Sequence, residues 1–232
     1  MRQIGGKMEE VIGPAQRGFM AGRQIVENVL ELDYEMPRAS LSDSDSAALL
    51  FDFTAAFPSV SHKYLWETMR RMGIPAPIIR AYQALYSNNS HSIRLDERQW
   101  QSVTVTSGVR QGCPISPLFF LLASEPLLRK LQKLQPDNKY RAYADDIGAV
   151  VRDLPRDIKG ITDTFAAFRK VSGLEINVNK TVVIPTRGDI TINATTLADY
   201  RHIMANTAWP NIEVAKEGKY LGFLVGMNVD RE

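Results

Sequence analysis

Apolar side chains recur at helical spacing in some stretches of the chain and alternate or run together in others. Residues at i, i+3, i+4 and i+7 share one face of a helix, whereas a short apolar run bounded by turn residues is typical of a buried strand. The helical pattern predicts helices around residues 25–36, 65–72, 78–86, 118–131 and 158–171. The strand patterns predict a hairpin over 142–150 and strands at 47–51, 91–96, 101–106, 182–184 and 219–226, the last with a glycine kink. The chain is therefore expected to mix helices with strands.

Two adjacent aspartates, Asp145 and Asp146, lie in the middle of the predicted hairpin, and Gly148 follows them. Successive strand side chains point to opposite faces, so a hairpin tip is one of the few places where neighbouring carboxylates both approach one cluster of ions. Two unneutralised acids repel each other, and a bound divalent cation relieves that repulsion. The simpler interpretation is a polar turn, which aspartate often forms.

A third acid, Asp52, follows directly after the apolar run 47–51. A buried strand that ends there would deliver a carboxylate at its tip. Two such strand ends in one sheet would supply the ligands of a two-metal phosphoryl-transfer centre, and oxygen ligands of this kind suit Mg²⁺. Lys180, in the polar turn before the strand at 182–184, is a further candidate for chemistry, with a solvated turn lysine as the alternative.

Two glycine-bearing loops carry candidate binding residues. Residues 16–23 (QRGFMAGR) hold two arginines, whose guanidinium fork matches phosphate oxygens; solvated surface arginines are the alternative. Arg110 and Gln111 project from the loop 107–117, just before a long apolar helix. Because a loop that leads into a helix N-terminus is a ready anion site, a triphosphate or a template backbone is the functional interpretation.

The composition narrows the class of protein only slightly. The 232 residues are 44% hydrophobic and 23% charged with a net charge of +2, which permits a nucleic-acid partner without arguing for one. One cysteine, Cys113, excludes an internal disulfide framework and a multi-cysteine zinc site, and it favours an intracellular protein. No apolar run approaches the roughly 20 residues of a membrane span, so no membrane partner is expected.

The order of these stretches resembles a reverse transcriptase, in particular the type encoded by non-LTR (LINE-like) retrotransposons. The matching stretches are residues 16–23 (QRGFMAGR), 51–60 (FDFTAAFPSV), 108–119 (GVRQGCPISPLF), 142–147 (AYADDI), 173–181 (GLEINVNKT) and 220–222 (YLG). Signals in this order over almost the whole chain are more specific than any one of them. Group II intron polymerases share this order of motifs, but the sequence of residues 108–119 is more similar to that of the retrotransposon type.

The resemblance implies an α+β fold, the fingers and palm of a right-hand polymerase, with an antiparallel palm sheet backed by helices. Residues 14–46 and 77–106 would be fingers-like, 47–76 and 107–212 would form the palm, and 213–232 would be the primer-grip strand region. The chain would start after the family's first fingers motif and stop before the thumb. It would thus be a partial reverse transcriptase domain of a longer retrotransposon polyprotein with a thumb and an endonuclease.

The resemblance also implies roles for the acidic residues. Asp52 and Asp145 would bind two Mg²⁺ ions, with Mn²⁺ as a substitute, and Asp146 would support the primer-side ion. Phe53 would add a backbone carbonyl ligand. Lys180 would protonate the pyrophosphate leaving group.

Around the incoming deoxynucleotide, the resemblance implies contacts from Arg23 and Gln111, with Gly112 giving the nucleotide room. Phe57 would be a steric gate, an aromatic ring that excludes a ribose 2′-hydroxyl. The chain departs from the family pattern at Pro58, where these enzymes usually carry Asp or Asn. The local backbone at this position is therefore expected to differ.

Nucleic acid would be contacted by Arg110 and by the primer-grip residues Tyr220, Leu221 and Gly222. The expected function is an RNA-directed DNA polymerase that adds dNTPs to a DNA primer on an RNA template by a two-metal mechanism. Family behaviour points to the nucleus, after synthesis in the cytoplasm. The alternatives are a catalytically inactive nucleic-acid-binding relic of such a domain and an RNA-dependent RNA polymerase, against which Phe57 argues.

Overall fold

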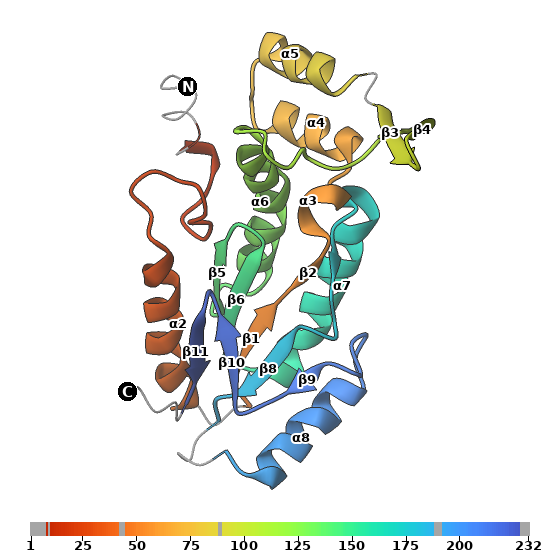
Figure 1. The fold of residues 1–232 in the computed structure, drawn as a ribbon. Helices are drawn as coiled ribbons and strands as arrows, with labels where there is room; N and C mark the ends of the chain where they lie inside the picture. Colours follow the sequence, from red (N-terminus) through yellow and green to blue (C-terminus); the bar gives the residue numbers. More distant parts are fainter. Residues whose placement is uncertain (1–7, 9, 42–44, 88–89, 188–191, 228–232) are drawn as a thin grey trace.

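A five-stranded sheet forms the centre of the computed structural model, which describes residue 8 and residues 10–41, 45–87, 90–187 and 192–227 (Figure 1). In sheet order its strands are β5 (Lys139–Tyr143), β6 (Asp146–Val151), β1 (Ala47–Phe51), β8 (Val182–Pro185) and β9 (Glu213–Val214). Neighbouring strands are antiparallel, except that β8 and β9 run parallel. The expected α+β fold with an antiparallel sheet backed by helices is confirmed.

The other described elements are helices and three smaller strand pairs. The helices include α2 (Ile25–Ser40), α3 (Ala56–Ser59), α4 (His62–Arg71), α5 (Ala76–Tyr86), α6 (Ser116–Leu134), α7 (Leu154–Ser172) and α8 (Ala194–Ala205). The small pairs are β2 (Phe53–Thr54) with β7 (Glu175–Ile176), β3 (Ser90–Leu95) with β4 (Arg98–Thr104), and β10 (Glu217–Tyr220) with β11 (Phe223–Gly226).

The middle strand, β1, is buried along its whole length because both of its faces are covered. Strand side chains alternate between faces. Leu49 and Phe51 join the larger core, which includes the apolar residues of α6 and α7, whereas Ala48 and Leu50 pack in a second core with residues of α2 and of the β10–β11 hairpin. This double burial explains why the run 47–51 has no polar position.

The C-terminal part of the sequence folds differently from the prediction. A single kinked strand over 219–226 is wrong, because β10 and β11 form a hairpin in which Tyr220 pairs with Phe223. The turn residues Leu221 and Gly222 have φ angles of 53° and 91°. Glycine adopts this left-handed backbone readily, so the glycine marks a turn and not a kink.

Helix α8 was not expected from the weak pattern of residues 186–212. Only Tyr200 and Met204 of this helix are buried, which leaves little amphipathic periodicity to detect. Asn193 caps its N-terminus by accepting a hydrogen bond from the amide of Thr196, 2.9 Å. Tyr200 connects α8 to the sheet, because its hydroxyl donates to the carbonyl oxygen of Ser46 over 2.6 Å.

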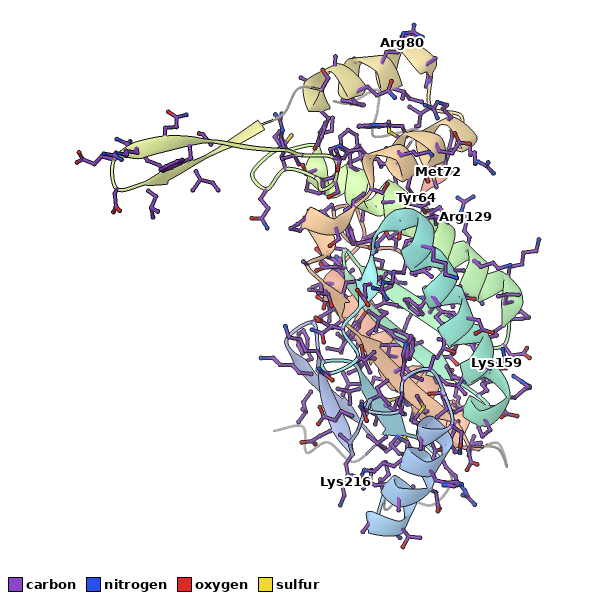
Figure 2. All side chains as sticks on the ribbon, turned by 90° about the vertical axis from the view of Figure 1, so that its right-hand side faces the viewer. Tyr64, Met72, Arg80, Arg129, Lys159 and Lys216 are labelled. Carbon is purple, nitrogen blue, oxygen red and sulfur yellow. The ribbon has the colours of Figure 1, made fainter. Side chains whose placement is uncertain are left out.

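Helices α4 and α5 and the β3–β4 hairpin lie at one end of the molecule, and the hairpin extends away from the body (Figures 1 and 2). The predicted hairpin is confirmed, with Asp96 and Glu97 in the turn. Tyr64, which Figure 2 labels, joins α4 to α6 through a 3.0 Å hydrogen bond from its hydroxyl to the carbonyl oxygen of Ala123. Within the described residues, no helix is both long enough and apolar enough to cross a membrane.

Candidate active site

Asp52 lies immediately after β1 and is held there by its backbone. The amide of Asn177 donates to the carbonyl oxygen of Asp52 over 2.8 Å, and the amide of Asp52 donates to the hydroxyl of Thr181 over 3.3 Å. The strand pair β2–β7 continues this contact, with Phe53 opposite Ile176. The predicted position of Asp52 at a strand end is therefore confirmed, and residues 173–181 fix it from the side.

Asp145 and Asp146 lie at the tip of the β5–β6 hairpin, as the sequence predicts. Tyr143 pairs with Asp146, which leaves Ala144 and Asp145 as the turn. Strand β6 also pairs with β1, where Phe51 lies opposite Ile147. Continuing this antiparallel register by one residue brings Asp52 opposite Asp146, so the three carboxylates gather at two neighbouring strand ends.

The acids influence one another electrostatically. Asp146 is an exposed residue at the first position of β6, yet its pKa is raised to about 6 by burial of the carboxyl group and by the charges of Asp145 and Asp52. Among the described residues, no group of three or more His, Cys, Asp or Glu side chains is arranged to hold a metal ion. The three acids thus have the donor chemistry for a hard divalent cation, but they do not close around one in this conformation.

Lys180 lies in the turn whose residue Asn177 is hydrogen-bonded to Asp52. Its amide donates to the carbonyl oxygen of Asn177 over 3.1 Å, and the same Asn177 bonds to Asp52. The lysine side chain is exposed. Its backbone therefore belongs to the acidic site, while a catalytic role of the ammonium group stays a prediction.

Phe57 lies on the short helix α3 and stacks on Phe120 of α6, with ring centroids 4.8 Å apart and an interplanar angle of 13°. Pro58 is exposed in the same helix, and its backbone packs closely against Gly108. A Cβ atom at Gly108 would lie 2.7 Å from the carbonyl oxygen of Pro58. The ring of Phe120 thus covers one face of the Phe57 ring. Gly108 leaves room for the backbone of Pro58, the residue that departs from the family pattern.

Arg110 and Gln111, the two predicted binding residues of the loop 107–115, have different surroundings. The guanidinium of Arg110 donates to the carbonyl oxygen of Leu85 over 2.9 Å and lies 5.3 Å from the centroid of the Tyr86 ring, so it packs on α5. Gln111 and Gly112 are exposed, and no atom lies within 4 Å of a Cβ built at Gly112. The loop therefore leaves open space beside Gly112, while the contact of Gln111 and Gly112 with a nucleotide stays a prediction.

In this conformation the side chain of Arg23 is hydrogen-bonded to the backbone of the preceding residues. Its guanidinium donates to the carbonyl oxygens of Gly13 and Gln16, both at 2.6 Å, and of Ile12 at 3.1 Å. These contacts tie the loop before α2 to itself. The predicted contact between Arg23 and an incoming nucleotide is untested.

The primer-grip residues divide into a buried anchor and an accessible turn. Tyr220 is 3% exposed, and its hydroxyl accepts from the Asn28 amide and donates to the Arg141 carbonyl oxygen, both at 3.2 Å. Burial raises the pKa of Tyr220. Leu221 and Gly222 instead line a cleft of about 560 Å³, which is also lined by the turn residues Ala144 and Asp145.

This cleft brings predicted and unpredicted residues together. It is lined by Phe19, Ile25, Tyr143, Ala144, Asp145, Asp146, Lys219, Leu221 and Gly222. Sequence reasoning missed Phe19, Tyr143 and Lys219, although the first two lie inside the matched stretches 16–23 and 142–147 and Lys219 directly precedes the stretch 220–222. Arg23 and Arg110 are not among the lining residues.

A family model described as reverse transcriptase (RNA-dependent DNA polymerase) matches residues 1–225. The chain belongs to this reverse transcriptase family. Members of this family act as RNA-directed DNA polymerases and generally use divalent metal ions. The expected resemblance is thereby confirmed.

The curated relatives of this reverse transcriptase domain come from non-LTR retrotransposons. The Pol polyprotein of element R2DM from Drosophila melanogaster is 25% identical over 215 residues, which cover 90% of this chain and 20% of the relative. The SLACS 132 kDa protein of Trypanosoma brucei gambiense is 33% identical over 197 residues, with coverages of 83% and 16%. The TX1 149 kDa protein of Xenopus laevis is 29% identical over 182 residues, with coverages of 75% and 14%. The chain therefore spans a fifth or less of the length of these relatives.

The reverse transcriptase domain also resembles solved telomerase structures. Apo telomerase from Candida tropicalis, truncated from its C-terminal domain, has a TM-score of 0.69 at 13% identity and covers 97% of this chain and 43% of that one. Telomerase from Candida albicans in complex with a fragment of telomeric RNA has a TM-score of 0.66 at 11% identity, with coverages of 97% and 37%. This likeness confirms the polymerase palm and fingers fold, whereas the expected boundaries between fingers and palm stay a prediction.

Proposed function

We propose that this reverse transcriptase domain adds deoxynucleotides to the 3′-hydroxyl of a DNA primer paired with an RNA template, at the ends of β1 and β6. The observation that carries this proposal is the pairing of Phe51 with Ile147, beyond which Asp52 and Asp146 follow at neighbouring strand ends, with Asp145 in the adjoining turn. Clustered acids are not needed for packing, and their repulsion helps to raise the pKa of Asp146. Such a cluster is suited to divalent cations.

Asp52, Asp145 and Asp146 would hold a pair of Mg²⁺ or Mn²⁺ ions, together with the backbone carbonyl oxygen of Phe53. The bound ions would activate the primer hydroxyl and neutralise charge on the reacting phosphate. Because substrate phosphates and waters commonly complete such ligand sets, the open arrangement of the three acids is compatible with binding. Lys180, whose turn is bonded to Asp52 through Asn177, would supply a proton to the pyrophosphate.

The sugar of the incoming nucleotide would lie against Phe57. The stacked ring of Phe120 prevents Phe57 from moving back, so a 2′-hydroxyl would overlap with the Phe57 ring. Gln111 would contact the nucleotide beside the open space at Gly112. A contact from Arg23 would require at least one of its carbonyl partners to be released.

The primer terminus would lie in the cleft between the catalytic turn and the β10–β11 turn. Phe19 and Tyr143, whose ring centroids are 6.5 Å apart, offer aromatic surface for a base or sugar. Leu221 and Gly222 would contact the primer backbone, and Tyr220 would hold their turn in place from within the core. Arg110 would face the template, supported by α5.

Insertion into a chromosome would involve further parts of a retrotransposon polyprotein. We place the RNA template, the primer and the dNTPs on this chain, and a thumb and an endonuclease elsewhere in a retrotransposon polyprotein. Reverse transcription at a chromosomal target would take place in the nucleus.

A second function, a nucleic-acid-binding domain without catalysis, is favoured by two observations. The described residues contain no closed group of three metal-binding side chains, and Pro58 stands where related enzymes usually carry Asp or Asn. In this case the cleft would still bind a primer–template duplex, but the acids would not support nucleotide addition.

Primer extension on an RNA template with Mg²⁺ tests the proposal. The wild-type chain is compared with Asp145→Asn and with the control Asp163→Asn, an exposed residue of α7 that pairs with Lys159 over 2.6 Å. We expect extension with dNTPs by wild type and control, and a loss of about a hundredfold or more in Asp145→Asn. Wild-type rates in Asp145→Asn would contradict the proposal. Duplex binding without extension by any of the chains would favour the second function.

A further inference from the structure

We propose that Gln16 is a positioning residue that fixes the turn of the catalytic hairpin and thereby aims the Asp145 carboxylate. This inference rests on the proposed function for its consequence in catalysis, but the contact itself is independent of activity. Gln16 is completely buried, and its side chain reaches across from the loop before α2 to the hairpin tip.

The carboxamide of Gln16 binds both polar groups of the Ala144 backbone. Its Nε2 donates to the carbonyl oxygen of Ala144 over 3.0 Å, and its Oε1 accepts from the amide of Ala144 over 2.9 Å. The same Oε1 accepts from the amide of Gly18 over 2.9 Å. An amide side chain matches a peptide group in this way because it offers one donor and one acceptor side by side.

The turn needs such support because of its backbone conformation. Ala144 has a φ of 56°, in the left-handed region that non-glycine residues seldom adopt. This conformation costs on the order of 1 kcal/mol for an alanine. The carbonyl of Ala144 belongs to the peptide bond that leads into Asp145, so rotation of that peptide would redirect the acid. Gln16 opposes the rotation by bonding both sides of Ala144.

The loop that carries Gln16 is itself firmly held. Its backbone forms a parallel bridge with Ala142 of β5, and Arg17 donates its amide to the Ala142 carbonyl oxygen over 2.8 Å. The Arg17 side chain is anchored on α2, with 2.8 Å to Asn28. Arg23 adds a 2.6 Å hydrogen bond to the carbonyl oxygen of Gln16. A fixed loop makes Gln16 a fixed reference point for the turn.

Gly18 shows how closely the loop approaches the turn. A Cβ at this buried glycine would lie 2.3 Å from the amide nitrogen of Ala144 and 3.1 Å from Gln16 Oε1. Both neighbours are held in place, so neither has room to yield. The loop and the turn therefore form one unit, in which a change in the loop is transmitted to the acid.

Amide hydrogen exchange tests the contact directly. Gln16→Met keeps the length and burial of the side chain but removes its hydrogen bonds. The matched control is Gln135→Met at the other end of β5, which removes a 2.7 Å hydrogen bond from Gln135 Nε2 to the Asp157 carbonyl oxygen and those that Gln135 Oε1 accepts from Tyr140 and Asn138. We expect exchange of the Ala144 amide, measured relative to Val150 in the same hairpin, to accelerate about tenfold or more in Gln16→Met and to stay unchanged in Gln135→Met.

Kinetics separate positioning from loss of fold. We expect Gln16→Met to lower kcat for nucleotide addition by roughly ten- to a hundredfold while the Kd for primer–template stays within about twofold, because misplacement of a reacting group chiefly affects kcat. Gln16→Glu keeps the acceptor for Ala144 and Gly18 but loses the donor, so an intermediate kcat is expected. Gln16→Asn, which is too short to reach, should behave like Gln16→Met.

Two results would overturn the inference. One is an unchanged relative exchange rate of Ala144 in Gln16→Met, and the other is a fall of kcat in Gln135→Met as large as in Gln16→Met. If the wild-type chain adds no nucleotide, the proposed function fails, and the exchange measurement alone decides whether Gln16 fixes the turn.

Discussion

Asn177 donates its backbone amide to the carbonyl oxygen of Asp52 over 2.8 Å, although the two residues lie far apart in the sequence. Thr181 completes the contact by accepting a hydrogen bond from the Asp52 amide. Without these hydrogen bonds, Asp52 would move whenever the end of β1 frays. The contact explains why the stretch 173–181 lies beside the acidic residue Asp52.

Replacing Thr181 should therefore disturb Asp52. Thr181→Val has nearly the same shape but loses the acceptor for Asp52 and the 2.9 Å hydrogen bond to the Asn177 carbonyl oxygen. We expect a loss of roughly 1–3 kcal/mol in the free energy of unfolding, measured by urea titration, and a marked loss of primer extension. Thr181→Ser keeps the hydroxyl and should keep the activity. Equal activity in the two variants would show that this hydrogen bond does not matter for the site.

The stability of the protein should depend on pH through Asp146. The pKa of Asp146 in the folded protein is about 6, above the ordinary value of 3.8, so the folded state holds this proton more tightly than the unfolded state. Without divalent cations, the stability contribution is fully present below pH 3.8 and is lost as pH rises through 6. Asp146→Asn should remove this loss. The resulting gain in the free energy of unfolding should be less than about 1 kcal/mol, because solvent screens charges at this exposed position.

Thermal melts of wild type and Asp146→Asn between pH 4 and pH 7 measure this effect. The variant should gain relative stability as pH rises from 4 to 6 and then keep a constant advantage. Asp163→Asn serves as the control and should follow the wild type. A stability difference that does not vary with pH would contradict the proposed interaction among the three acids.

Phe57 should determine the choice between deoxynucleotides and ribonucleotides. Phe57→Ala removes the ring that would overlap with a 2′-hydroxyl, and we expect the preference for dATP over ATP, measured as the ratio of kcat/KM values, to fall at least about tenfold. Phe120→Leu keeps Phe57 but removes the ring stacked behind it at 4.8 Å, so a smaller fall is expected. An unchanged preference for dATP in Phe57→Ala would show that Phe57 is not the steric gate.

The sequence predicts the parts of the site that follow from periodicity. The uninterrupted apolar run before Asp52 and the apolar flanks of Asp145 and Asp146 reflect strands that are buried on both faces, and such runs can be recognised without knowledge of neighbours. What the pattern cannot provide is the register between β1 and β6. That register, in which Phe51 pairs with Ile147 just before the acids, depends on contacts between distant segments.

The features that sequence reasoning missed depend on tertiary contacts. Helix α8 buries only Tyr200 and Met204, so its hydrophobic pattern is too weak to detect. The turn between β10 and β11 places Leu221, a non-glycine residue, at a φ of 53°, which no local preference predicts. The sequence places Gln16 only within a glycine-bearing loop, because two hydrogen bonds of its carboxamide go to Ala144, which is 128 residues away.

Binding of Mn²⁺ to the chain with primer–template and an unreactive dNTP analogue, followed by electron paramagnetic resonance, tests the central claim most directly. If the ends of β1 and β6 form one metal-binding centre, Asp52→Asn and Asp145→Asn should each weaken Mn²⁺ binding at least about tenfold, whereas Asp163→Asn should bind like the wild type. Wild-type affinity for Mn²⁺ in Asp52→Asn would show that the two strand ends do not act together, and it would contradict the account.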